Sequence, residues 1–160
     1  MLLYTQKINL KYKVSGEKNN IVTKTGLDGY LCVICEDELE NNKIYKWKIK
    51  IFKTRKYDIK IGIACINYMG KSQNYQNGWY LFTADYNLYS RPPQNFSGIN
   101  SGLKQDNEII VSMDINKGIL KFITKNEDKG DCYTIIPKDK PLFPSIIFYS
   151  KDDFVEIINC

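Results

Sequence analysis

The sequence predicts an all-β protein, a sandwich or a barrel, that forms one domain over residues 1–160. Many short stretches alternate apolar and polar residues, and polar turn sequences separate them. No segment longer than about 12 residues shows clean helical periodicity. The chain is also long enough to bury a substantial core. Short strands joined by polar turns are typical of sandwiches and barrels.

The expected strands follow one another along the whole chain. They cover 4–14, 20–24, 29–36, 43–53, 57–66, 78–83, 107–114, 118–124, 131–136, 143–150 and 154–159. The turns between them are rich in Gly, Asn, Asp and Pro, as in SGEKNN, TGLDG, NEDKGD and PKDKP. Two stretches rich in Tyr, Asn, Gln and Ser, 67–77 and 86–103, are expected to be long loops. Long loops on a rigid β scaffold commonly bind partners.

The stretch 43–53 shows the alternation most clearly. Its odd positions from Tyr45 to Ile51 are apolar or aromatic, and its even positions from Lys46 to Lys50 are lysines. Basic residues interleaved with aromatic ones also occur on nucleic-acid-binding surfaces. Strict alternation, however, indicates a half-buried strand with a solvated outer face. We therefore expect no nucleic-acid partner.

The stretch SMDINKGILKF, residues 112–122, is either a calcium loop or a hairpin turn. Asp114, Asn116 and Gly118 begin a D-x-N-x-G pattern. An EF-hand loop needs a bidentate Glu at its twelfth position, where this chain has Lys125. We expect a hairpin in which Asp114 stabilises the turn, and no metal site.

Composition limits the possible chemistry. The chain has no histidine, which removes Ser-His-Asp and Cys-His mechanisms. It has five scattered cysteines and a single CxxC, Cys32 and Cys35, in the strand-like run YLCVIC. Residues three apart on a strand point to opposite faces, so we expect buried free thiols and no cofactor. The net charge of +5 comes almost entirely from lysine.

The first residues, MLLYTQKINL, lack the long apolar region of a signal peptide, and no stretch resembles a transmembrane span. We therefore expect an intracellular protein, cytoplasmic or nuclear, without a membrane partner.

The order of the motifs resembles the SPRY domain, the core of B30.2 modules. YKWKIKI is followed by YDIKIGIA, NGWYLF, DNEIIVSMDINKGILKFITKN, PLFPSIIFY and FVEIIN. The matching positions are Trp47, Gly62, Gly78, Trp79, Asp114, Gly118, Leu120, Phe122, Leu142, Pro144, Val155 and Ile157. The resemblance is strongest over 28–159. Lys48 stands where the family often has Glu, and no PRY segment is evident in 1–27.

The resemblance implies a two-sheet antiparallel β-sandwich of the concanavalin-like jelly-roll type. It also implies that the chain is not an enzyme. Loops at one end would bind a peptide motif or a protein surface, in an adaptor or a ubiquitin ligase substrate receptor. The chain would be the whole protein or one domain of a larger one. Tyr and Arg are favoured at interaction hot spots. The expected partner-binding residues are therefore Arg55, Tyr68, Tyr75, Tyr89, Arg91 and Tyr149. Arg pairs well with carboxylates, so the expected partner is acidic or amide-rich. We expect the isolated domain to be a monomer.

A glycan-binding or glycan-processing role is the alternative. Concanavalin-like sandwiches also bind sugars, and EDELE places Glu36, Glu38 and Glu40 on one face of an extended strand. Glycosidases use paired carboxylates. In the similar glucanase motif an Asp stands where this chain has Glu38, and the run leads into the turn ENN.

Overall fold

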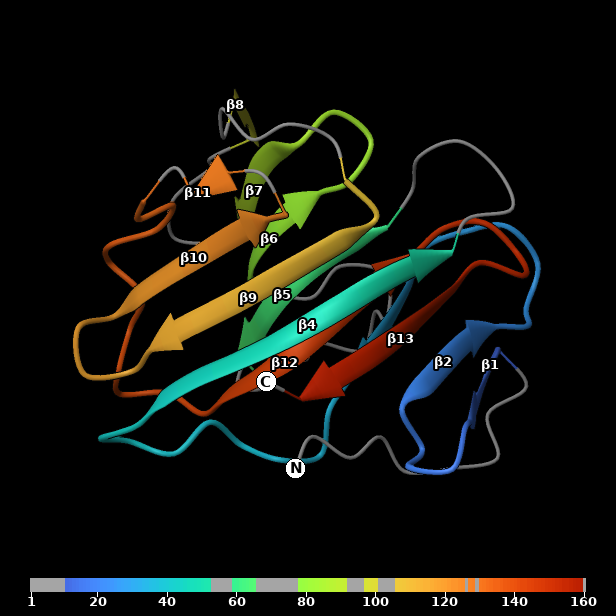
Figure 1. The fold of residues 1–160 in the computed structure, drawn as a ribbon, viewed down its shortest axis with the longest axis horizontal. Coiled ribbons are helices and arrows are strands. Elements are labelled where there is room, and N and C mark those ends of the chain that lie inside the picture. Colours follow the sequence, from blue (N-terminus) through green and yellow to red (C-terminus); the bar gives the residue numbers. More distant parts are fainter. Residues whose placement is uncertain are drawn as a thin grey trace.

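The computed structural model describes residues 11–52, 59–65, 78–91, 97–100, 106–125, 127–128 and 130–159. These residues form two antiparallel sheets that face each other, and no helix occurs among them (Figure 1). The all-β sandwich prediction is therefore confirmed. Within these ranges, no helix is long and apolar enough to cross a membrane.

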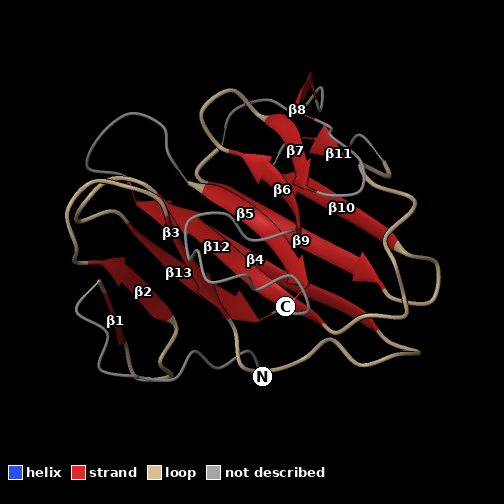
Figure 2. Cartoon of the chain, turned by 180° about the vertical axis from the view of Figure 1, so that it is seen from behind, coloured by secondary structure: helices blue, strands red, loops and turns tan. Residues whose placement is uncertain are grey.

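The first sheet has seven strands and lies in front in Figure 1. Their order is β1 (Tyr12–Ser15), β2 (Ile21–Lys24), β13 (Phe154–Asn159), β4 (Ile44–Phe52), β9 (Glu108–Asp114), β10 (Ile119–Thr124) and β11 (Glu127–Asp128). The second sheet has six strands and is seen from its own side in Figure 2. Their order is β3 (Leu31–Ile34), β12 (Leu142–Phe148), β5 (Lys60–Cys65), β6 (Gly78–Phe82), β7 (Asn87–Arg91) and β8 (Ser97–Asn100).

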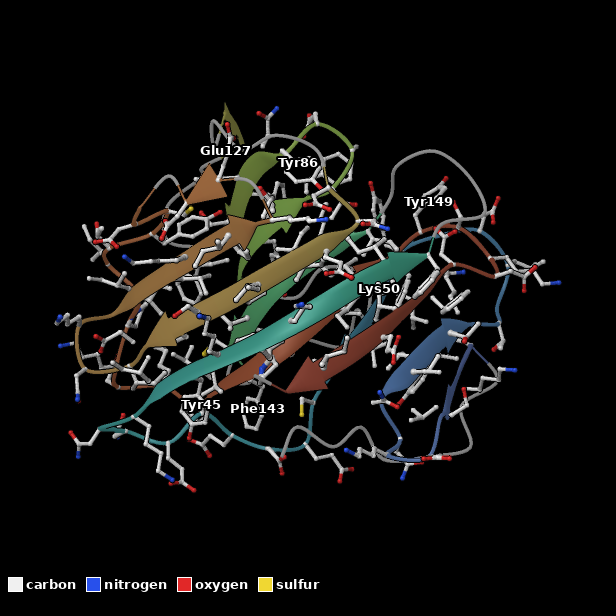
Figure 3. The ribbon with its side chains drawn as sticks, viewed as in Figure 1. Tyr45, Lys50, Tyr86, Glu127, Phe143 and Tyr149 are labelled. Atoms are coloured by element: carbon white, nitrogen blue, oxygen red, sulfur yellow. The ribbon has the colours of Figure 1, made fainter. Side chains whose placement is uncertain are left out.

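β4 follows the alternation expected from its sequence. Trp47, Ile49 and Ile51 are buried in the core between the sheets, whereas the lysines at 46, 48 and 50 lie on the outer face. β4 pairs with β13 on one side and β9 on the other, which places it in the middle of the first sheet. Lys50 can be seen on this outer face in Figure 3.

The hairpin prediction for residues 112–122 is also confirmed. β9 and β10 pair from Asp114 opposite Ile119 onward. Asp114 Oδ1 accepts a hydrogen bond of 3.0 Å from the Lys117 backbone N–H. Gly118 closes the turn at φ 67°, a conformation that glycine adopts without steric penalty. The carboxylate therefore stabilises a turn, as expected.

Two predictions about secondary structure were wrong. The range 86–103 was expected to be a loop, but it contains β7 and β8. β7 forms because it pairs with β6 and directs Leu88 into the core, so tertiary pairing outweighs the polar composition. The range 131–136 was expected to be a strand, yet it makes only an isolated bridge, between Tyr133 and Leu120. Tyr133 and Ile136 are buried and Ile135 is exposed, which is not the two-residue period of a strand.

The core fills the space between the sheets and includes both tryptophans, Trp47 and Trp79. Cys35 lies in this core, whereas Cys32 points to the opposite face of β3, as expected from their spacing. All the cysteines described, Cys32, Cys35, Cys65 and Cys132, are free thiols.

Candidate functional site

Two turns meet at one end of the sandwich. Residues 25–30 join β2 to β3, and residues 149–153 join β12 to β13. The Gly29 N–H donates to the Tyr149 carbonyl at 2.9 Å, and the Lys151 N–H donates to Asp28 Oδ1 at 2.9 Å. Tyr149 marks this end in Figure 3. These two hydrogen bonds fasten the backbones of the two turns to each other.

Lys24, a buried lysine at the end of β2, holds the first turn in place. Its Nζ donates to the Gly26 carbonyl at 3.0 Å and to the Leu27 carbonyl. Burial lowers the pKa of Lys24, while the nearby carboxylates of Asp28 and Asp153 act in the opposite direction. The turn is thus fixed from inside, and the Leu27 side chain remains 86% exposed.

A row of aromatic side chains begins at these turns and crosses the outer face of the second sheet. We call Tyr30, Phe82, Tyr89 and Tyr149 the aromatic row. Tyr149 and Tyr30 meet edge to face, with ring centroids 5.1 Å apart. The Lys60 Nζ lies 4.9 Å from the Tyr30 centroid, 5.4 Å from that of Phe82 and 4.1 Å from that of Tyr89. Lys60 therefore links the two ends of the row.

Strand alternation explains why these side chains share one face. Ile61, Leu81 and Leu88 point into the core. Their chain neighbours Lys60, Phe82 and Tyr89 must therefore point outward. β5 also pairs with β6 so that Lys60 lies directly opposite Phe82.

Farther along the same face lies a small polar cluster. Ser145 Oγ is 3.2 Å from Cys32 Sγ and 3.4 Å from the Tyr80 hydroxyl. Burial raises the pKa of the Cys32 thiol to about 12 and that of Tyr80 well above its usual value. Both groups are protonated near neutral pH, and a protonated thiol is a poor nucleophile. The cluster is suited to hydrogen bonding and not to covalent chemistry.

The structure brings together two of the six predicted partner-binding residues. Tyr89 and Tyr149 both belong to the aromatic row, although Tyr89 lies on β7 and not on a loop. Arg91 ends β7 opposite Gly78 instead of lying on a loop, and its side chain is outside the described part. The remaining three, Arg55, Tyr68 and Tyr75, lie outside the described residues.

Sequence reasoning missed Leu27, Tyr30 and Lys60. A signal for Lys60 was present in YDIKIGIA, where the isoleucines occupy one face of the strand and Lys60 supplies a charge on the other. Leu27 was the one apolar residue in the turn sequence TGLDG. Nothing in the sequence shows that Tyr30 contacts Lys60 and Tyr149, because the three lie on different strands or turns.

A pocket of about 300 Å³ lies at the opposite end of β4, beside the β9–β10 turn. Leu39, Ile115 and Leu142 line it together with charges of both signs, including Glu38 and Lys138. The extended strand expected for EDELE is not observed, since β3 ends at Ile34 and the three glutamates follow in irregular chain. Among the described residues, no group of His, Cys, Asp or Glu could hold a metal ion.

The comparisons with known proteins agree with this architecture. The family model described as SPRY domain matches residues 44–159. The SPRY domain of human HERC1 is similar in structure, with a TM-score of 0.68 at 19% identity, over 93% of this chain and 94% of that one. The TRIM65 PSpry domain has a TM-score of 0.72 at 9% identity, over 99% of this chain and 92% of that one. Stonustoxin has a TM-score of 0.69 at 14% identity, over 99% of this chain and 28% of its own. At these identities the likeness shows a shared fold. No curated protein matches the sequence.

Proposed function

The chain belongs to the SPRY domain family, whose members are generally non-catalytic interaction modules, and we propose that it binds a peptide motif or a protein surface. The binding surface would be the end of the sandwich formed by Leu27, Tyr30 and Tyr149. A role as a substrate-recognition or scaffold domain is part of this proposal.

The observation that carries the proposal is an exposed apolar side chain and two tyrosines on a pair of turns that hydrogen bonds join to each other. Leu27 is 86% exposed at the tip of its turn, although Lys24 and Asp28 fasten that turn from two sides. Tyrosine supplies a large apolar surface together with a hydroxyl that can form hydrogen bonds, and it is enriched at hot spots. A surface ordered before binding loses little conformational entropy when a partner arrives.

Short random peptides displayed on phage and selected on the isolated domain would test this proposal. Peptides enriched on the domain should bind Leu27→Ser and Tyr149→Ala about 30-fold more weakly, because hot-spot truncations cost about 2 kcal/mol. Circular dichroism should show that both variants remain folded, since Leu27 makes little contact with the core.

Ile135→Ser provides a matched control. Ile135 is 71% exposed, lies outside both turns, and should not affect peptide affinity when replaced. Peptides that bind the Leu27 and Tyr149 variants as tightly as the unaltered domain would contradict the assignment of the surface.

A further inference from the structure

A pocket lies at the end of the sandwich opposite the Leu27 surface. We call it the far pocket; it is enclosed by the connections 38–41 and 138–142 and by Ile115 of the β9–β10 turn. Tyr45, at the start of β4, marks this end in Figure 3. The volume of about 300 Å³ is at the lower end of the range for ligand sites. The far pocket therefore suits one large side chain of a partner better than a whole cofactor.

Backbone hydrogen bonds join the walls of the far pocket. The Leu39 N–H donates to the Leu142 carbonyl at 2.8 Å, which ties the first connection to β12. The Ile115 N–H donates to the Lys43 carbonyl at 3.2 Å, which ties the β9–β10 turn to the chain that enters β4. The cavity is thus present in the free domain, and a partner does not have to open it at a cost in free energy.

The floor of the far pocket is apolar. Leu39, Ile115 and Leu142 line it, and each is at most 3% exposed. Contact with such a floor removes the apolar surface of a ligand from water, which is the main favourable term in association. Burial of one leucine-sized side chain corresponds to about 10- to 100-fold in affinity. The far pocket therefore favours an apolar side chain as its occupant.

The walls carry more negative than positive charge. Along 36–43 and 138–142 the sequence has five carboxylates and three lysines, an excess of two negative charges, whereas the whole chain has a net charge of +5. Glu38 lines the far pocket and is exposed to solvent. Charges at the rim of an interface act on the orientation and specificity of a partner more than on its affinity. A lysine or arginine beside the apolar side chain therefore complements these walls.

We infer that the far pocket is a second docking site, which receives a large apolar side chain that stands next to a lysine or arginine in a partner protein. The apolar side chain would pack on Leu39, Ile115 and Leu142, and the cation would lie beside Glu38.

This site is separate from the surface proposed above, with which it shares no residue. β4 alone, nine residues long, separates the two ends by about 26 Å. One short motif therefore does not cover both sites, and the domain is able to bind two partner segments at once. The inference goes beyond the proposed function and does not depend on it.

An NMR titration of the nitrogen-15-labelled, unaltered domain tests the inference. The probe is a synthetic peptide, blocked at both ends, in which one leucine stands between two lysines and the other residues are glycine and serine. Because a single anchor binds weakly, the peptide is added to millimolar concentration. The backbone amide signals of Leu39, Asn41, Ile115 and Leu142 should shift.

Two altered peptides separate the anchor from the charge. Replacing the leucine of the peptide by serine should weaken binding about 10- to 100-fold, because the apolar contact is lost. Replacing its lysines by glutamate should weaken binding about fivefold, as for an exposed ion pair, and the difference should shrink in high salt.

Variants of the domain locate the site. Asn41→Trp places a large side chain at the mouth, since Asn41 is exposed and lines the far pocket, and it should abolish the shifts of Ile115 and Leu142. Asn116→Trp is the matched control, because Asn116 is exposed on the β9–β10 turn but does not line the far pocket; it should bind like the unaltered domain. Glu38→Lys should reverse the preference, so that the glutamate peptide binds more tightly than the lysine peptide.

The outcomes keep the two proposals apart. Absence of shifts around the far pocket, or equal binding by the Asn41→Trp and unaltered domains, would overturn the inference and leave the Leu27 surface untouched. Binding that ignores the exchange of lysine for glutamate would show that the stated partner chemistry is wrong. If the Leu27 and Tyr149 variants fail their own test, the shifts around the far pocket should still appear. Should Asn41→Trp not fold, Glu38→Lys and the altered peptides still decide the question.

Discussion

Replacing Gly62 with alanine should disrupt the pairing of β5 with β6 beneath the candidate site. A Cβ at position 62 would lie 1.9 Å from the Trp79 carbonyl oxygen and 2.9 Å from the Trp79 carbonyl carbon. Real Cβ atoms essentially never come closer than 3.0 Å to such atoms. The obstacle is backbone of the neighbouring strand and not the end of a flexible side chain. The strand itself must therefore move.

The size of the effect follows from this displacement. The Trp79 oxygen would have to retreat by about 1 Å, in an interior that is packed as closely as an organic crystal. Overpacking of this kind costs about 1–3 kcal/mol, and each weakened ladder hydrogen bond adds about 1 kcal/mol. We expect Gly62→Ala to lower the free energy of unfolding by about 2–4 kcal/mol, a large part of the 5–15 kcal/mol typical of a domain.

Urea unfolding followed by circular dichroism measures this free energy. Gly130→Ala is the control, because a Cβ there meets nothing within 4 Å and only the positive φ of 83° opposes it. Gly130→Ala should lower the free energy of unfolding by about 1 kcal/mol. A Gly62→Ala variant as stable as the Gly130→Ala variant would refute the argument that close approach of the strands requires glycine in this motif.

Two further predictions concern buried hydroxyl and thiol groups. The Tyr133 hydroxyl donates to the Tyr80 carbonyl at 2.9 Å, so Tyr133→Phe should lower the free energy of unfolding, measured in urea, by about 1 kcal/mol. The Tyr45 hydroxyl accepts an exposed N–H of Glu40, so the control Tyr45→Phe should lower it by less. Equal losses in the two variants would contradict this reasoning. The pKa of Cys32 is about 12 in the folded chain against 9.0 for the free thiol. The unfolded chain therefore loses this proton first, and stability should be full below about pH 9 and decline toward pH 12. Cys32→Ala should flatten that decline, and an unchanged slope would exclude Cys32 as a contributor.

The fold was predictable where burial follows a simple period. β4 and β9 alternate in the sequence as they do in the structure, because one face of each meets the core. β7 was not predictable in this way, since a single apolar residue, Leu88, anchors a strand otherwise made of Asn, Tyr, Ser and Arg. Its existence depends on the adjacent edge of β6, which no local pattern reveals.

The candidate site was predictable only in part, for a related reason. Tyr149 was expected as a partner-binding tyrosine, and the structure puts it at the end where two turns meet. Tyr30 and Lys60 join it through contacts between residues far apart in the sequence. Residue type and spacing along one strand cannot predict such contacts, because they depend on the order of strands in the sheet.

Lysine itself shows how the two outer faces of the sandwich differ. Lys48 and Lys50 alternate with apolar residues on β4 as Lys60 does on β5, so their local patterns are alike. On the first sheet both lysines remain about one third exposed and lie 3.4 and 3.9 Å from Glu108. Such surface pairs contribute at most about 1 kcal/mol and weaken in salt.

On the second sheet Lys60 is nearly covered and is held by aromatic rings instead of solvent. A charge in that position is expensive to bury, and the ring faces of Tyr30, Phe82 and Tyr89 offset part of that cost. The same local pattern therefore has two outcomes: the lysines of the first sheet stay partly solvated, and the lysine of the second sheet is covered beside the aromatic row.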